Sequence, residues 1–135
     1  MAVYKIFASA DTTLYSAYPT QNAGLDEILE VACKNSSIPS VVLSAGSGDD
    51  IRRTLIKFSD EDLMLAKNFL SSSSASYDAY LRLYLANAEN LNTLYSIEIL
   101  QASQSWEMGT GKFLDLPAAT NGACWSTTDL SLIHI

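Results

Sequence analysis

The chain has 135 residues, 48% of them hydrophobic, and a formal net charge of −7. This length and composition predict one domain with its own core. The acidic balance argues against nucleic acid or an anionic membrane as a partner, because both require a clustered basic surface.

The first third of the chain predicts short strands separated by a loop. Residues 2–8 alternate apolar and polar side chains, and residues 12–16 are β-branched and aromatic, so both are expected to be strands. A loop follows that contains Pro19, Asn22 and Gly24. Alternation returns at residues 27–34, where Leu29, Val31 and Cys33 would share one face.

The middle of the chain predicts a strand followed by a helix. Residues 35–50 are rich in Ser, Gly and Asp and indicate a mobile loop. Residues 51–58 predict a strand with Arg53 and Lys57 on one face and with Thr54, Ile56 and Phe58 on the other. After residue 58 the spacing of apolar side chains changes from that of a strand to that of a helix. Ser59 or Asp60 can cap a short helix over residues 59–70, with acidic residues in its first turn.

After a serine-rich spacer at residues 71–76, two further strands are predicted, over 77–88 and 94–102. In the first, Leu81, Leu83 and Leu85 would point inward. One-sided alternation favours antiparallel sheets. The fold class predicted from these elements is therefore mainly β: an antiparallel, jelly-roll-like β-sandwich with one short helix.

The stretch SWEMGTGKFLDLP, residues 105–117, contains a glycine pair that raises the question of a phosphate-binding loop. A Walker A loop would need glycine where Trp106 stands and Ser or Thr where Phe113 stands. A dinucleotide fingerprint would need glycine in place of Leu114. Both templates fail, so the prediction is a turn in which Gly109 and Gly111 take positive φ.

Acidic residues form three clusters, at residues 26–30, 49–50 and 60–62. A glycosidase would need two acids facing each other across a cleft, which the sequence does not show. A calcium site built from aspartates is a minor alternative, because no EF-hand spacing is present. Two cysteines, Cys33 and Cys124, indicate synthesis in a reducing compartment and are expected to be small buried hydrophobes. The prediction is a non-enzymatic protein with no catalytic residue, no metal and no cofactor.

Aromatic residues supply the candidate binding site. Tyr80, Arg82 and Tyr84 would form the outward face of the strand at 77–88, where tyrosines can stack on sugar rings or pack against a neighbouring subunit. Trp106 is a further candidate for ligand binding, although it and Trp125 more readily hold a long loop against the end of the barrel.

The last six residues, LSLIHI at 130–135, follow a polar stretch without any turn residue. Their codons can match the mosaic-end adaptor of transposase-based sequencing libraries. We therefore expect the reading frame to pass from the native gene into adaptor sequence near Asp129. His134, the only histidine, lies in this tail and is assigned no role.

In order, the stretches DTTLYSAYPTQNAGLDEILEV, RRTLIKF, AYLRLYLANA and a closing W…P…W segment resemble the DNRLRE-type β-sandwich over most of residues 1–126. The amino-acid sequence of these stretches is most similar to the versions of the domain in virion structural proteins of marine tailed phages. The resemblance implies that residues 1–129 form an incomplete, C-terminally truncated sandwich, the N-terminal part of a larger protein.

The resemblance also implies a function. It indicates a non-enzymatic structural or adhesion domain located in the virion and synthesised in the host cytoplasm. Its partners would be other virion proteins, further copies of itself, or a host-surface polysaccharide. Because some members of the family are secreted and bind carbohydrate, a polysaccharide-binding module is the alternative function.

Overall fold

The structure is a computed structural model that describes residues 3–34, 50–71, 76, 78–88 and 97–129. Its regular elements are strands β1 (Ala8–Tyr15), β2 (Ala32–Lys34) and β3 (Asp50–Phe58), followed by helix α1 (Asp60–Ser71). Residues 35–49 of the loop predicted at 35–50, most of the serine-rich spacer and the tail at 130–135 lie outside the described residues. Within the described parts, antiparallel β-structure and one helix account for all regular elements.

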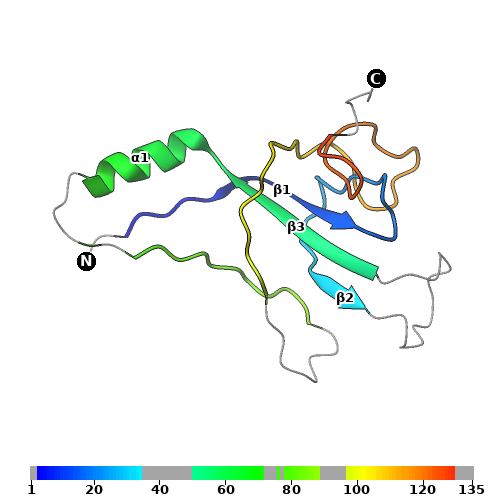
Figure 1. The fold of residues 1–135 in the computed structure, drawn as a ribbon, viewed down its shortest axis with the longest axis horizontal. Coiled ribbons are helices and arrows are strands. Elements are labelled where there is room, and N and C mark those ends of the chain that lie inside the picture. Colours follow the sequence, from blue (N-terminus) through cyan, green and yellow to red (C-terminus); the bar gives the residue numbers. More distant parts are fainter. Residues whose placement is uncertain (1–2, 35–49, 72–75, 77, 89–96, 130–135) are drawn as a thin grey trace.

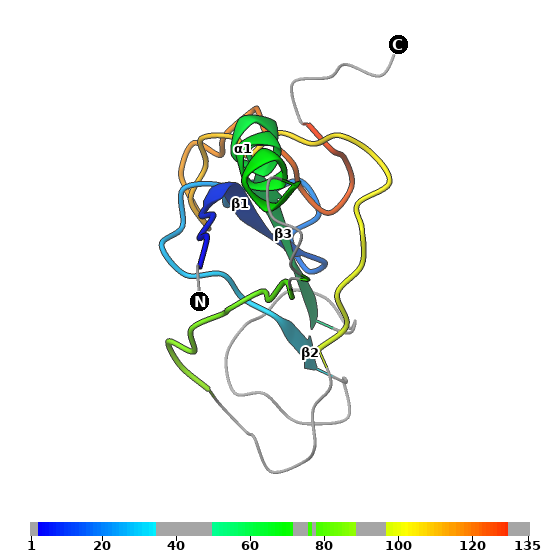
Figure 2. The ribbon, with the colours of Figure 1, turned by 90° about the vertical axis from the view of Figure 1, so that its left-hand side faces the viewer.

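The three strands form one antiparallel sheet in the order β1-β3-β2 (Figures 1 and 2). The central strand, β3, pairs with β1 from Ala8↔Phe58 to Tyr15↔Arg52, and its first residues also pair with β2. The register shifts between Ala8 and Ala10, where Ser9 Oγ donates to the carbonyl of Lys57. The strand predicted at 51–58 is therefore confirmed within one residue, and the strand predicted at 12–16 is confirmed at its C-terminal end but begins four residues earlier, at Ala8.

The predicted faces of β3 are also confirmed. Arg53 and Lys57 are exposed, whereas Thr54, Ile56 and Phe58 are half-buried. The strand predicted at 27–34 is correct only for its last three residues, because the backbone before them bonds to side chains. The N–H of Glu30 donates to Thr13 Oγ1, and the carbonyl of Glu30 accepts from Thr54 Oγ1. Since Thr13 and Thr54 are paired across the sheet, residue 30 spans both strands.

Helix α1 begins where the sequence predicts. Ser59 is the N-cap, because its Oγ accepts from the N–H of Asp62 and its carbonyl accepts from the N–H of Leu63. Asp60, Glu61 and Asp62 fill the first turn, where the helix dipole favours negative charge. The helix buries only Ala66 and lies at the end of β3 opposite the loops formed by residues 105–129 (Figure 1).

Three other predicted strands are wrong in the described residues. Residues 3–7, 78–88 and 97–102 have no strand structure, and none of them is drawn as an arrow in Figure 1. The leucines expected to point inward, Leu81, Leu83 and Leu85, are 46%, 56% and 78% exposed. Alternation specifies which face of a strand is apolar, but a strand forms only where its backbone groups pair. No described segment pairs with these residues.

The core lies at the Tyr15 end of β1, under loops from both ends of the chain. Its buried residues include Tyr15, Ala23, Trp106, Ala123 and Cys124, with exposed fractions of 7% or less. Phe113 stacks on the ring of Tyr15 at a centroid distance of 4.3 Å. Irregular segments far apart in sequence therefore complete a core that the sheet alone does not close.

Candidate functional site

The four sequence-predicted binding residues occupy two very different environments. Tyr80 and Tyr84 are 87% and 85% exposed, and Arg82 is also exposed, but they lie on an irregular segment instead of a sheet face. Trp106 is only 7% exposed and belongs to the core. A ring covered in this way presents no free face for a sugar, which agrees with the prediction that Trp106 holds a loop in place. Trp125 was the other residue predicted to hold a loop. The guanidinium of Arg53 lies over its ring, at 5.0 Å from the ring centroid.

Backbone N–H groups of the glycine-rich segment at 109–113 bond to side chains of the protein itself. The N–H of Gly111 donates to Asn22 Oδ1, that of Lys112 to Asp115 Oδ2, and that of Phe113 to Asp26 Oδ1. A phosphate-binding loop needs such N–H groups free to face the ligand. Here protein oxygens already occupy them, in keeping with the prediction of a turn. Gly109 has the predicted positive φ, 78°, whereas the positive φ predicted for Gly111 occurs instead at Leu114, 62°.

Asn22 is the residue around which these loops are organised. It is 1% exposed, and its Nδ2 donates to the carbonyls of Met108, at 2.8 Å, and Ala123, at 2.9 Å. Its Oδ1 accepts from the N–H groups of Gly24, at 3.2 Å, and Gly111, at 2.8 Å. All four hydrogen-bonding positions of the amide are therefore used, and a buried amide satisfied in this way fixes three segments in one geometry.

Glycines surround Asn22 because the backbone approaches it closely. A Cβ on Gly109 would lie 2.5 Å from Asn22 Oδ1, and a Cβ on Gly111 would lie 2.7 Å from the carbonyl oxygen of Asn22. A Cβ on Gly24 would lie 2.0 Å from the carbonyl oxygen of Met108. Any side chain at these positions would push the loops apart. We call Asn22 and these three glycines the asparagine knot.

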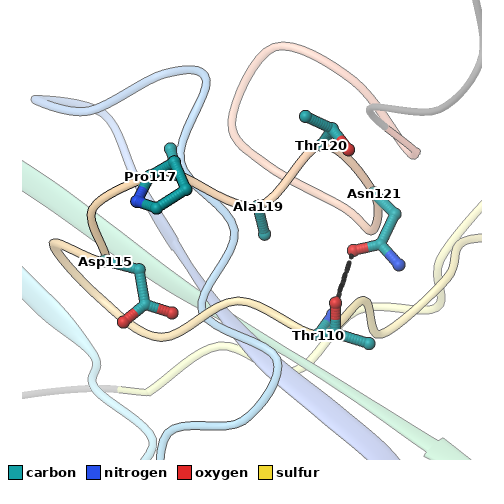
Figure 3. A pocket seen from close by; sticks show the side chains of 7 residues that line it. Thr110, Asp115, Pro117, Ala119, Thr120 and Asn121 are labelled. Atoms are coloured by element: carbon teal, nitrogen blue, oxygen red, sulfur yellow. Dashed lines mark hydrogen bonds between the residues drawn. The ribbon is translucent and has the colours of Figure 1, made fainter.

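A shallow hollow lies on the loop that follows Gly109 and Gly111 in the chain (Figure 3). It has a volume of about 540 Å³ and is lined by Thr110, Asp115 and residues 117–121. Figure 3 shows Asp115 on one side and the hydrogen-bonded pair Thr110 and Asn121 on the other, with Pro117 and Ala119 between them. A second hollow of about 330 Å³ shares Thr110 and Asn121 and extends to Glu107 and Asp129. The Thr110–Asn121 pair thus forms a common wall of two adjoining depressions.

A charged cluster covers the sheet beside the core. Arg52 donates through Nε and Nη2 to Asp50 Oδ2 and through Nη1 to Glu30 Oε2. Its guanidinium also lies 5.5 Å from the ring centroid of Tyr15, whose hydroxyl donates to Glu30 Oε1 at 3.3 Å. The hydrogen bond to Asp50 raises the pKa of Arg52 above its usual range, so the guanidinium stays charged. Burial, followed by the charge of Glu30, raises the pKa of Tyr15 to about 12.

The acidic clusters of the sequence are divided among separate structural tasks. Asp26 accepts the N–H of Phe113, Glu30 and Asp50 hold Arg52, and Glu27 pairs with Lys112 Nζ at 2.8 Å. That ion pair raises the pKa of Lys112 and lowers that of Glu27. Asp49 lies outside the described residues. Within the part of the chain that is described, no group of three or more His, Cys, Asp or Glu side chains is arranged to hold a metal ion.

Cys124 is 2% exposed and its Sγ lies 3.3 Å from Ser126 Oγ, which confirms the prediction of a small buried side chain. The side chain of Cys33 lies outside the described residues. None of the described helices has the length and apolar character needed to cross a membrane.

Sequence reasoning missed the asparagine knot and the Arg52 cluster. The N-x-G spacing of Asn22 and Gly24 was visible, but it indicated only a loop. Its partners, near residues 108 and 123, are roughly 90 to 100 positions away. No local sequence pattern predicts such distant partners, because the burial and the hydrogen bonds of an amide depend on residues that are close in space and not in sequence.

Comparison of the chain with protein-family models, with curated proteins and with solved structures finds no match in any of the three.

Proposed function

We propose that this chain is a non-enzymatic contact domain, a structural or adhesion component of a tailed-phage virion. We further propose that its antiparallel sheet belongs to a β-sandwich in which residues 78–88 and 97–102 become strands once they are paired. The resemblance of its motifs to the DNRLRE-type sandwich supports the class. The arrangement of apolar side chains supports the mode of action.

The observation that carries the proposal is the exposure of large apolar side chains on two neighbouring parts of the sequence. Tyr84, Leu85 and Leu100 are 85%, 78% and 78% exposed, and Ile97 and Ile99 are 64% and 67% exposed. Large apolar side chains that are exposed together along a segment are characteristic of sites that bind other macromolecules. Single apolar side chains scattered over a surface carry no such meaning, but here they recur along two segments that alternate as strands do.

The loops support a structural role in a second way. The backbone N–H groups of Gly111, Lys112 and Phe113 all bond to side chains of the same protein. The carboxylates of Glu30 and Asp50 both bond to Arg52. These groups, which could otherwise bind a phosphate or act as acid and base, contribute to holding the fold.

Self-association of the purified chain tests the proposal. Sedimentation velocity over a range of concentrations should show reversible assembly that weakens in the double variant Leu85→Ser/Leu100→Ser. A matched variant, Val31→Ser, removes a 62% exposed apolar side chain from another segment and should assemble like the parent. A monomer at every concentration, or equal effects of the two changes, would count against contact through these segments. Capsid or tail genes beside the coding sequence would support the virion assignment, and their absence from an intact contig would oppose it.

A polysaccharide-binding module is the second candidate, favoured by the exposure of Tyr80 and Tyr84. An exposed tyrosine ring can stack on the apolar face of a sugar. Binding to a glycan array that disappears in Tyr84→Ala would support this function over pure assembly.

A further inference from the structure

We propose that Asn121 is a deamidation site that reacts only when the loop over residues 120–129 opens, so that the modification records the opening. This inference goes beyond the contact function proposed above and does not depend on it. Asn121 is followed by Gly122, and the two form the only Asn-Gly pair in the chain. Such a pair is reactive because glycine has no side chain to hinder the approach of its backbone nitrogen to the asparagine side chain.

The reaction consumes only groups of the chain and water. The backbone nitrogen of Gly122 attacks Cγ of Asn121 and forms a new C–N bond, which closes a succinimide ring. The bond from Cγ to Nδ2 of Asn121 breaks, and the proton of the Gly122 N–H leaves with that nitrogen as ammonia. Water then opens the ring, at Cγ to give aspartate or at the backbone carbonyl carbon to give isoaspartate.

Hydrogen bonds hold both reacting groups in place while the loop is closed. The N–H of Gly122 donates to Asp129 Oδ1 at 2.9 Å. Asn121 Oδ1 accepts from the N–H of Thr110 at 3.2 Å and from its Oγ1 at 3.0 Å, and Figure 3 shows the Asn121 amide nitrogen directed away from Thr110. To bring the nitrogen of Gly122 onto Cγ, the peptide plane must rotate away from Asp129 and the amide must turn away from Thr110. Deamidation therefore requires these bonds to break.

The packing around Gly122 leaves no room for that rotation in the closed loop. A Cβ on Gly122 would lie 2.3 Å from the Cα of Gly109 and 2.5 Å from Asn22 Nδ2. The next residue, Ala123, is 1% exposed, and its carbonyl accepts the hydrogen bond from Asn22 Nδ2. The reactive peptide is thus packed against the asparagine knot, and the free energy of local opening controls the rate of the reaction.

The products oppose closure of the loop, so the modification marks the chain permanently. Asn121 and Gly122 line the hollow of about 330 Å³ together with Glu107 and Asp129. Aspartate at this position would add a negative charge beside these two acids, and like charges repel. Isoaspartate would add a carbon atom to the main chain next to Gly122, where the backbone of Gly109 already leaves no space.

A second Asn-Gly pair in the same chain provides the reference rate. Ala88→Gly gives Asn87 a glycine neighbour in an exposed segment without strand structure. The full-length variant is incubated at mildly alkaline pH, and peptide mass spectrometry follows the conversion of each amide to an acid. In native buffer, Asn87 should deamidate at least about tenfold faster than Asn121, the equivalent of one hydrogen bond that must break first. In urea the two rates should converge, because both pairs are then unfolded.

Two variants test the bonds that hold the loop closed. Asp129→Ala removes the acceptor of the Gly122 N–H, and Thr110→Val removes the hydroxyl that donates to Asn121. Each should speed deamidation of Asn121 about tenfold, and Asp78→Ala, which changes an exposed acid elsewhere, should leave the rate unchanged.

Thermal melts check that the variants fold, and the comparison with Asn87 needs neither of them. Equal rates at Asn121 and Asn87 in native buffer, or no reaction at Asn121 in urea, would overturn the inference. Slower deamidation in Asp129→Ala would also overturn it, because Asp129 would then act as the base that removes the proton of the Gly122 N–H.

Discussion

The side-chain amide of Asn22 donates a hydrogen bond to the carbonyl of Ala123, 2.9 Å away in space and 101 residues away in sequence. With three further bonds from the same amide, this contact joins the loop after β1 to both arms of the segment at 108–123. The core beside Tyr15 depends on that connection, because residues from both loops cover it.

Asn22→Ala should lower the free energy of unfolding by about 3 kcal/mol or more, because it leaves several buried backbone groups unpaired at about 1–3 kcal/mol each. Urea unfolding followed by tryptophan fluorescence measures the change. Asn87→Ala is the control, since Asn87 is exposed and its side chain bonds only to the next N–H. That control should change stability by less than about 0.5 kcal/mol. Similar losses in the two variants would contradict the central role of Asn22.

Two positions with positive φ should respond to substitution in opposite directions. Gly109, at φ 78°, would place a Cβ 2.5 Å from Asn22 Oδ1, so Gly109→Ala should destabilise the fold by about 2 kcal/mol or more. Leu114, at φ 62°, is half exposed, so Leu114→Asn should stabilise it by about 0.5–1 kcal/mol, because asparagine tolerates this conformation better. Differential scanning calorimetry measures whether the melting temperature falls in Gly109→Ala and rises in Leu114→Asn. Destabilisation by Leu114→Asn would show that the side chain of Leu114 matters more than its backbone.

Tyr15 should make stability depend on pH in the alkaline range. Its pKa rises from 10.0 to about 12 in the folded protein, so the folded state holds the phenolic proton more tightly than the unfolded chain does. The resulting stabilisation, about 2–3 kcal/mol, is complete below pH 10 and disappears as the pH rises to about 12.

Tyrosinate absorbance measures this directly, because the ionisation of Tyr15 should appear as a step near pH 12. Tyr15→Phe should remove the late step and flatten the difference in urea midpoint between pH 9 and pH 12. A late step that persists in Tyr15→Phe would assign it to another tyrosine.

Arg52→Gln should cost about 1–2 kcal/mol, because it leaves the carboxylates of Glu30 and Asp50 close together without a cation. The loss is smaller than for a fully buried ion pair, because the side chain of Glu30 is 39% exposed and solvent screens its charge. Arg53→Gln is the neighbouring control. It removes only the contact with the ring of Trp125, worth about 0.5–1 kcal/mol at an exposed site. Chemical denaturation in low and high salt compares them, and a larger loss in Arg53→Gln would contradict the assignment.

Local patterns were sufficient for β3, α1 and the second half of β1. In β3 the exposed Arg53 and Lys57 alternate with half-buried Thr54 and Ile56, which is what a strand of period two requires. Helix α1 begins at a serine cap followed by three acids, and capping is decided within one turn. The failed templates at Trp106, Phe113 and Leu114 likewise predicted a turn at Gly109, where φ is positive.

The amino-acid sequence by itself determined which residues can alternate, cap a helix or turn, because these properties depend on neighbours within a few positions. Only the tertiary structure decided that Leu81, Leu83 and Leu85 stay exposed, since a strand needs a partner and the pattern does not name one. It also decided that Asn22, Gly111 and Ala123 meet and that Asp115 faces Asn121 across a hollow. Such contacts join residues many positions apart, and their geometry exists only once the chain has folded back on itself.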